Sequence, residues 1–106
     1  MTLRPPQNLS NTARGDKSSN PLEAELRQEQ AVTLGNLGRE VQKTLAALKA
    51  SPAAHDSAEY AELVDTAARA VWHYFIQREM CGLHEHDDAI EEFGIPKAVL
   101  ARLGAF

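Results

Sequence analysis

The chain has 106 residues, of which 43% are hydrophobic and 25% charged, and these values are typical of one folded, soluble domain. No apolar run approaches the roughly 20 residues that cross a bilayer, and the sequence starts without the apolar core of a secretory signal. A single cysteine excludes an intrachain disulfide, which together with the missing signal predicts a cytoplasmic protein without membrane contact.

The net charge of −4 is unevenly distributed along the chain. Residues 51–94 carry ten carboxylates against only Arg69 and Arg78, a net charge of −8, whereas residues 1–20 and 95–106 each carry +2. An acidic centre repels phosphate backbones, so we expect no nucleic-acid partner.

Residues 1–20 are rich in proline, serine and asparagine and contain few hydrophobic residues. Such a segment buries too little surface to offset the cost of ordering, which predicts a flexible N-terminal arm. Asn20 is a favourable helix N-cap and Pro21 suits the first helical position. A single helical domain is therefore predicted over residues 21–106.

The first predicted helix is long and amphipathic. Apolar residues recur at helical spacing from Leu22 to Leu48 within an arc of about 140°, and the pattern ends near Ala50. Gly35 and Gly38 each cost roughly 1 kcal/mol relative to alanine, so a break is possible there. Two interpretations of the glycines stay open: a tolerated pair, or a small residue at position 38 that lets another helix approach closely.

A second helix follows the loop that Pro52 imposes. Asp56 and Glu59 form a start that resembles a capping box, and Gly82 provides a left-handed stop after Cys81. Two long helices joined by a short loop favour an antiparallel hairpin.

This second predicted helix is apolar on two sides. A main stripe of apolar side chains runs along its whole length and includes Tyr74 and Phe75. Trp72, Ile76 and Met80 form another stripe, here called the outer stripe, roughly 100° or more away around the helix. The outer stripe requires its own cover, from the C-terminal residues, a second subunit or a ligand.

Two short helices are predicted at the C-terminal end. The first is stopped by Gly94, and Ile95-Pro96 starts the second. Both are too short to be stable alone, so we expect them to dock on the outer stripe. The predicted fold class is therefore all-α: a long antiparallel helical hairpin plus two short C-terminal helices.

Arg78 projects from the middle of the main stripe, where an unpaired charge would be costly. Its side chain can reach water from the helix end. Alternatively it forms an ion pair with Glu23, Glu29, Glu40 or an acid of a second subunit, or it binds an anion.

Cys81, His84 and His86 are candidate metal ligands. They provide the sulfur and nitrogen donors that zinc accepts within six residues of sequence. Their spacing is not that of known zinc sites, and a second pair of ligands is missing unless His73 or a second subunit contributes. Solvent-facing histidines and a buried structural cysteine are the competing interpretation, so we predict no cofactor.

Catalysis and DNA binding have weak support in the sequence. Cys81 and His84 lack an identifiable third group to orient them, so we predict no catalytic residues and no enzymatic activity. Residues 89–103 resemble a helix-turn-helix, but only Lys97 and Arg102 would be available to phosphates.

The segments Trp72-His73, Gln77-Arg78-Glu79, Cys81-Gly82-Leu83 and Gly94-Ile95-Pro96 resemble the C-terminal half of a small family of uncharacterised bacterial proteins. This family is chiefly alphaproteobacterial and has no assigned activity. The resemblance covers about residues 22–104 and implies a bacterial cytoplasmic setting without implying any chemistry.

The sequence thus favours a non-enzymatic homo-oligomeric interaction or scaffold module, expected to be a homodimer. A metal-binding or small-ligand-binding protein is the alternative, and a DNA-associated regulator is the third candidate.

Overall fold

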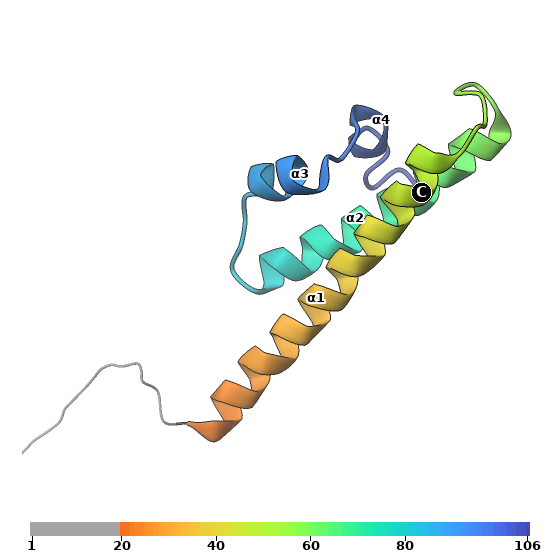
Figure 1. Cartoon of the computed structure of the whole chain (residues 1–106). Helices are drawn as coiled ribbons and strands as arrows, with labels where there is room; N and C mark the ends of the chain where they lie inside the picture. The colour runs from red at the N-terminus through yellow and green to blue at the C-terminus, as the bar shows by residue number, and fades with distance from the viewer. Residues whose placement is uncertain (1–19) are drawn as a thin grey trace, which may run out of the picture. The chain divides into compact units, whose positions relative to one another are not determined.

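The structure is a computed structural model in which residues 20–106 are described (Figure 1). The predicted flexible arm lies outside the described residues except for Asn20. The chain divides into two units, residues 1–32 and residues 33–106.

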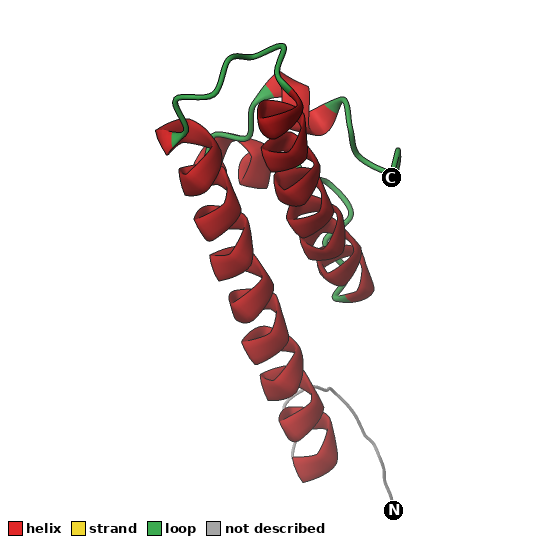
Figure 2. Cartoon of the chain, turned by 90° about the vertical axis from the view of Figure 1, so that its right-hand side faces the viewer, coloured by secondary structure: helices red, strands yellow, loops and turns green. Residues whose placement is uncertain are grey.

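Residues 20–106 contain four helices and no strand, which confirms the all-α prediction. The helices are α1 (Pro21–Ala50), α2 (Ala58–Met80), α3 (Asp87–Phe93) and α4 (Lys97–Leu100). From residue 33 onward, α1 packs antiparallel to α2, and the two short helices follow, as predicted (Figures 1 and 2). None of the described helices is both long and apolar enough to traverse a membrane.

The helix α1 is continuous, so the two glycines do not break it. Its predicted start is confirmed, because the side-chain oxygen of Asn20 accepts hydrogen bonds from the backbone N–H groups of Leu22 at 3.0 Å and Glu23 at 3.4 Å. In the second unit, Gly38 is buried, and a Cβ atom added there would lie 3.5 Å from the ring of Tyr74 and 3.6 Å from that of Phe93. Gly38 therefore makes room for the rings of Tyr74 and Phe93, and not for the backbone of another helix.

The helix α2 starts one residue later than the sequence indicated. The N-cap is Ser57, not Asp56: its hydroxyl oxygen accepts a hydrogen bond from the backbone N–H of Tyr60 at 3.1 Å. Ser57 also has the extended backbone of an N-cap, with φ −86° and ψ 156°. The helix ends at Cys81 as its C-cap, followed by Gly82.

The hydrophobic core of the second unit combines residues from all four helices. Its three largest fully buried side chains are Val41 of α1, Val71 of α2 and Val99 of α4. The other buried hydrophobic residues of the core are Leu45, Leu48, Val64, Ala67, Ala68, Ala70, Tyr74, Phe75, Ala89 and Ile95.

The short helices dock mainly on the main stripe of α2, and the predicted cover of the outer stripe is confirmed only at Trp72, which Gly104 and Phe106 contact. Phe93 of α3 meets Tyr74 edge-on with 5.3 Å between ring centroids, and Val99 places α4 in the core beside α2. The buried residues of α2 span roughly 160° of its circumference, which is more than one neighbouring helix covers. Because α1 covers only part of this arc, α3 and α4 complete the cover.

Gly94 ends α3 in the left-handed conformation that the sequence predicted, with φ 63° and ψ 47°. Glycine adopts this backbone without a Cβ clash, and the chain then turns directly into Ile95, which is buried. This turn brings α4 back onto α2.

Candidate functional site

The outer stripe of α2 is the largest apolar feature on the surface of this helix. Trp72, Ile76 and Met80 are 38%, 40% and 70% exposed, whereas Tyr74 and Phe75 of the main stripe are each only 8% exposed. Six residues of α2 were predicted to pack or to contact a partner. Tyr74 and Phe75 lie in the core, Arg78 on the main stripe is half-buried, and the surface group consists of Trp72, Ile76 and Met80.

The residues that follow α4 reach only one end of the outer stripe. The aromatic ring of Phe106 meets Trp72 edge-on, with 6.2 Å between ring centroids, and the guanidinium carbon of Arg69 lies 4.7 Å from the centroid of the Phe106 ring. Gly104 has φ 77°, and a Cβ atom there would lie 3.3 Å from the indole ring of Trp72. The predicted cover by C-terminal residues is thus limited to Trp72.

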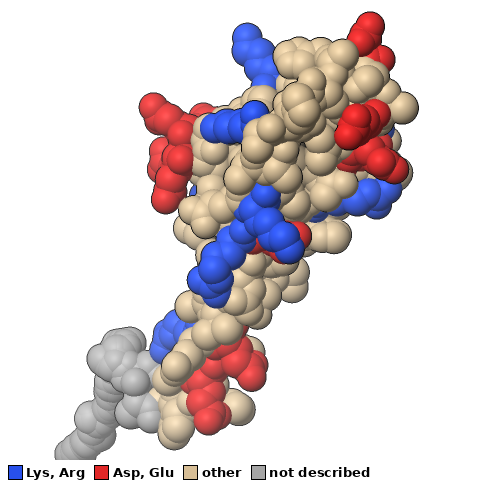
Figure 3. Space-filling view, turned by 45° about the vertical axis from the view of Figure 1, so that its right-hand side comes forward, with Lys and Arg blue, Asp and Glu red and all other residues tan. Residues whose placement is uncertain are grey.

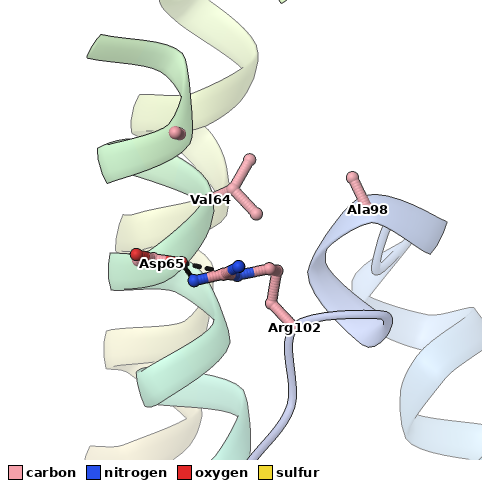
Figure 4. A pocket seen from close by; sticks show the side chains of 5 residues that line it. Val64, Asp65, Ala98 and Arg102 are labelled. Carbon is pink, nitrogen blue, oxygen red and sulfur yellow. Dashed lines mark hydrogen bonds and ion pairs between the residues drawn. The ribbon is translucent and has the colours of Figure 1, made fainter. Parts of the chain in front are cut away.

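An ion pair fastens this C-terminal segment to α2. A guanidinium nitrogen of Arg102 lies 2.7 Å from a carboxylate oxygen of Asp65 (Figure 4). The pair forms one wall of an open hollow of about 230 Å³ between α2 and α4, which is also lined by Ala61, Val64 and Ala98. Small-molecule sites usually exceed roughly 300 Å³ and combine apolar walls with several convergent polar groups. The hollow is smaller than this, and its two charged side chains, Asp65 and Arg102, are paired with each other.

A second open hollow, of about 220 Å³, lies where α1 of the second unit approaches α3. It is lined by Gln42, Leu45, Ala46, Lys49, Glu92 and Phe93. It is also below the usual size of a ligand site.

The side chain of His86 is a structural element of the fold, which sequence reasoning missed. Its ring is only 14% exposed and stacks on Phe75, with centroids 4.1 Å apart and planes 4° from parallel. Only the folded chain brings these residues together, since eleven positions and a turn separate them in sequence. The single hint in the sequence is that His86 immediately precedes α3.

Both ring nitrogens of His86 are engaged. Arg78 Nε donates to His86 Nδ1 at 3.2 Å, and a guanidinium group only donates, so Nδ1 must carry a lone pair. The ring proton is therefore on Nε2, which donates to Glu79 Oε2 at 2.8 Å. A second guanidinium nitrogen of Arg78 donates to the backbone carbonyl of Glu85 at 2.9 Å. Arg78 is thus held by two acceptors of the α2–α3 connection.

The predicted metal ligands are not assembled into a site. Among residues 20–106, no group of three or more His, Cys, Asp or Glu side chains is placed to hold a metal ion. His84 is exposed, and Cys81 is half-buried, with its Sγ atom 3.7 Å from Nε2 of Gln77. His86 could reach a metal only by giving up a hydrogen bond.

The segment that resembles a helix-turn-helix lacks a recognition helix. The helix α4 spans only Lys97–Leu100, and it turns Val99 into the core together with Ile95 at its start. A recognition helix must instead present exposed side chains along several turns to the major groove. On the face drawn in Figure 3, acidic side chains gather on two sides of the upper part, and several basic side chains lie between and below them.

The described part of the chain is therefore a small helical hairpin with two docked short helices, whose distinctive feature is a surface stripe rather than an assembled pocket. The model of a family of unknown function, DUF6665, matches residues 1–106, and the chain belongs to this family. The match extends beyond the resemblance over residues 22–104 to both ends of the sequence, and the family has no assigned activity. Comparisons with curated proteins and with solved structures give no match.

Proposed function

We propose that the protein is a non-enzymatic interaction module that self-associates as a homodimer in the bacterial cytoplasm. The observation that carries the proposal is the exposure of the outer stripe after α3 and α4 have docked elsewhere. Burial of one large apolar side chain contributes about 1.5 to 3 kcal/mol, so a stripe of three is a strong candidate for the centre of an interface.

The size of the chain supports the same proposal. A domain of about 100 residues buries a smaller share of its surface than a larger protein does, and a second copy supplies the missing burial. In the first unit, the helical residues Leu22 and Leu26 are 73% and 55% exposed, and burial of such apolar side chains against a partner is favourable. Self-association would give such residues a partner surface.

A non-enzymatic role is supported by the way the reactive side chains are used. His86 and Arg78 hold the α2–α3 connection, and Cys81 is beside Gln77 rather than beside an imidazole. A nucleophile needs a base within hydrogen-bond reach and a third group that orients the base. The described contacts of Cys81 supply neither.

Light scattering coupled to size exclusion, over micromolar to millimolar concentrations, tests the proposal. We expect twice the chain mass of 11.6 kDa for the natural protein and a monomer for Ile76→Glu and Met80→Glu. Ala47→Glu is the matched control, because Ala47 is an exposed position of α1. A monomer at every concentration, or an equal effect of Ala47→Glu, would refute the proposal.

The alternative function is metal or small-ligand binding through Cys81, His84 and His86. It requires His86 to leave Phe75 and at least one of its hydrogen-bond partners, so binding would be accompanied by rearrangement of the α2–α3 connection. Calorimetric titration with Zn²⁺ distinguishes the two functions, since stoichiometric binding that is lost in His84→Ala would favour the alternative.

A further inference from the structure

We propose that residues 104–106 form a strap that covers Trp72 and opens by an exchange of arginine partners at Asp65. In the closed arrangement, which is the one the structure shows, Asp65 pairs with Arg102 at the base of the strap. In the open arrangement the same carboxylate pairs with Arg69 of its own helix, and the strap leaves α2. The role of the strap in limiting access to the outer stripe rests on the proposed function, whereas the exchange itself does not depend on it.

Two contacts hold the strap and its base in the closed arrangement. Arg102 reaches one carboxylate oxygen of Asp65 twice, with its Nε atom at 2.8 Å and a terminal guanidinium nitrogen at 2.7 Å. The ring of Phe106 meets Trp72 edge-on, and its centroid lies 4.7 Å from the guanidinium carbon of Arg69. Each of the two contacts therefore involves an arginine cation.

The backbone of the strap can lie close to the indole ring because its first residue is a glycine. Gly104 has φ 77°, a conformation that glycine adopts without strain, and a Cβ atom there would lie 3.3 Å from the Trp72 ring. The strap follows Leu103, which packs against the core, and Val99 of α4, which is fully buried. Residues 104–106 can therefore move while α4 stays docked.

Asp65 and Arg69 are placed to pair with each other on α2. They are four residues apart, so their side chains lie on one face of the helix, about 6 Å apart along its axis. An acid that precedes a base by four residues is the favourable order for such a pair. Within residues 20–106 this pair is not formed, because Arg102 takes the carboxylate and Arg69 lies on Phe106. When Arg102 leaves, Asp65 can draw Arg69 away from the strap.

The closed and open arrangements should be close in free energy. The side chains of Arg102 and Asp65 are 45% and 35% exposed, and ion pairs at such positions contribute little to stability. The open arrangement replaces this pair with one of similar strength, so opening costs mainly the contacts of Phe106. This ring is itself 42% exposed, which limits what its contacts contribute. We therefore expect both arrangements to be populated in solution.

Opening changes the surface that the outer stripe offers to a partner. In the closed arrangement the accessible part is centred on Ile76 and Met80, because the strap lies against Trp72. In the open arrangement all three side chains are accessible, and tryptophan is among the residues that most often dominate binding energy. The closed strap therefore limits association through the outer stripe.

Quenching of Trp72 fluorescence by acrylamide measures how far the strap is open, since Trp72 is the only tryptophan in the chain. The parent for this experiment carries Met80→Glu, which the proposed function expects to prevent dimerisation and which lies about two turns from Trp72. Phe106→Ala in the same parent gives the quenching of an uncovered indole. Circular dichroism shows for each variant that the helices are intact.

Arg102→Gln and Asp65→Asn both break the closed ion pair, but they should differ in their effect. Arg102→Gln leaves Asp65 to pair with Arg69, so the ratio of open to closed strap should rise by about twofold to fivefold and quenching should increase. Asp65→Asn removes an ion pair from both arrangements, so quenching should stay close to that of the parent. Two controls should also match the parent: Arg102→Lys keeps the charge, and Glu62→Gln removes an exposed carboxylate elsewhere on α2.

Equal increases for Arg102→Gln and Asp65→Asn would indicate an ordinary ion pair without exchange and would overturn the inference. An unchanged signal for Arg102→Gln would overturn it as well, because the ion pair would then not hold the strap. So would an unchanged signal for Phe106→Ala, because the strap would then not lie on Trp72.

Light scattering of chains without Met80→Glu tests the proposed function separately. Arg102→Gln should strengthen dimerisation by making Trp72 accessible. A dimer that Arg102→Gln does not strengthen would overturn the control of access by the strap. A monomer at every concentration would refute the proposed function, while the quenching results would still decide whether Asp65 exchanges its partners.

Discussion

The imidazole ring of His86 lies flat on the phenyl ring of Phe75, and so fixes the start of α3 against α2. The same imidazole joins Arg78 to Glu79 through its two nitrogens. One side chain thus combines aromatic stacking with two polar contacts in the chain segment that joins α2 to α3.

We predict that His86→Ala destabilises the protein by about 1 to 3 kcal/mol, because it removes the stacked ring and leaves Arg78 Nε without its acceptor. His84→Ala is the matched control, since His84 is exposed and should change stability by less than about 0.5 kcal/mol. Urea unfolding followed by circular dichroism measures both. Similar effects of the two substitutions would show that the stack contributes nothing.

The two glycines of α1 should respond differently to a large side chain. Gly38→Leu should cost about 1 to 3 kcal/mol, because the added atoms would overlap the rings of Tyr74 and Phe93. Gly35→Leu should be neutral or stabilising by up to about 1 kcal/mol, because its nearest neighbour is the movable guanidinium group of Arg39. Thermal unfolding of the two variants would contradict this interpretation if they lost stability equally.

The one-turn helix α4 should contribute to global stability mainly through Val99, its one fully buried side chain. Val99 is fully buried, so Val99→Ala should lower the free energy of unfolding by about 2 kcal/mol, through lost burial plus a cavity. Val32→Ala makes the same chemical change at a 55% exposed position and should cost less than about 0.5 kcal/mol. An unchanged unfolding midpoint for Val99→Ala would mean that α4 detaches before the core unfolds.

Trp72 reports on the C-terminal segment, because it is the only tryptophan in the chain. Phe106→Ala removes the ring that meets the indole edge-on and exposes more of the indole to water. We expect the fluorescence emission of Trp72 to move to longer wavelength. Leu26→Ala changes an exposed side chain of the first unit and should leave the emission unchanged. An unshifted spectrum for Phe106→Ala would indicate that the segment does not stay on Trp72 in solution.

Local signals predicted the elements of this fold well. Asn20 and Gly94 marked helix ends correctly because a cap depends on the residue itself and its nearest neighbours. The adjacent residue Ser57 replaced Asp56 as the cap of α2, since either side chain could accept the bond and only the backbone conformation decides between them.

The packing was harder to predict from the sequence. The apolar patterns of α2 identified two stripes but not which neighbour covers each, because that depends on how much of its wide buried arc α1 reaches. The stack of His86 on Phe75 depends on the path of the turn between α2 and α3, which no local pattern specifies. The surface and core groups among the predicted packing residues could therefore be separated only in the folded chain.

The way α3 and α4 fold back onto α2 also bears on how quickly the native structure can form. Within the second unit, α2 packs against the helix that precedes it and the two that follow, and most contacts of the described residues are local in sequence. Helical proteins rich in local contacts typically fold within about microseconds to milliseconds. Because α2 loses its contacts only when all its neighbours have left, its backbone amides should be the last in the unit to exchange with solvent.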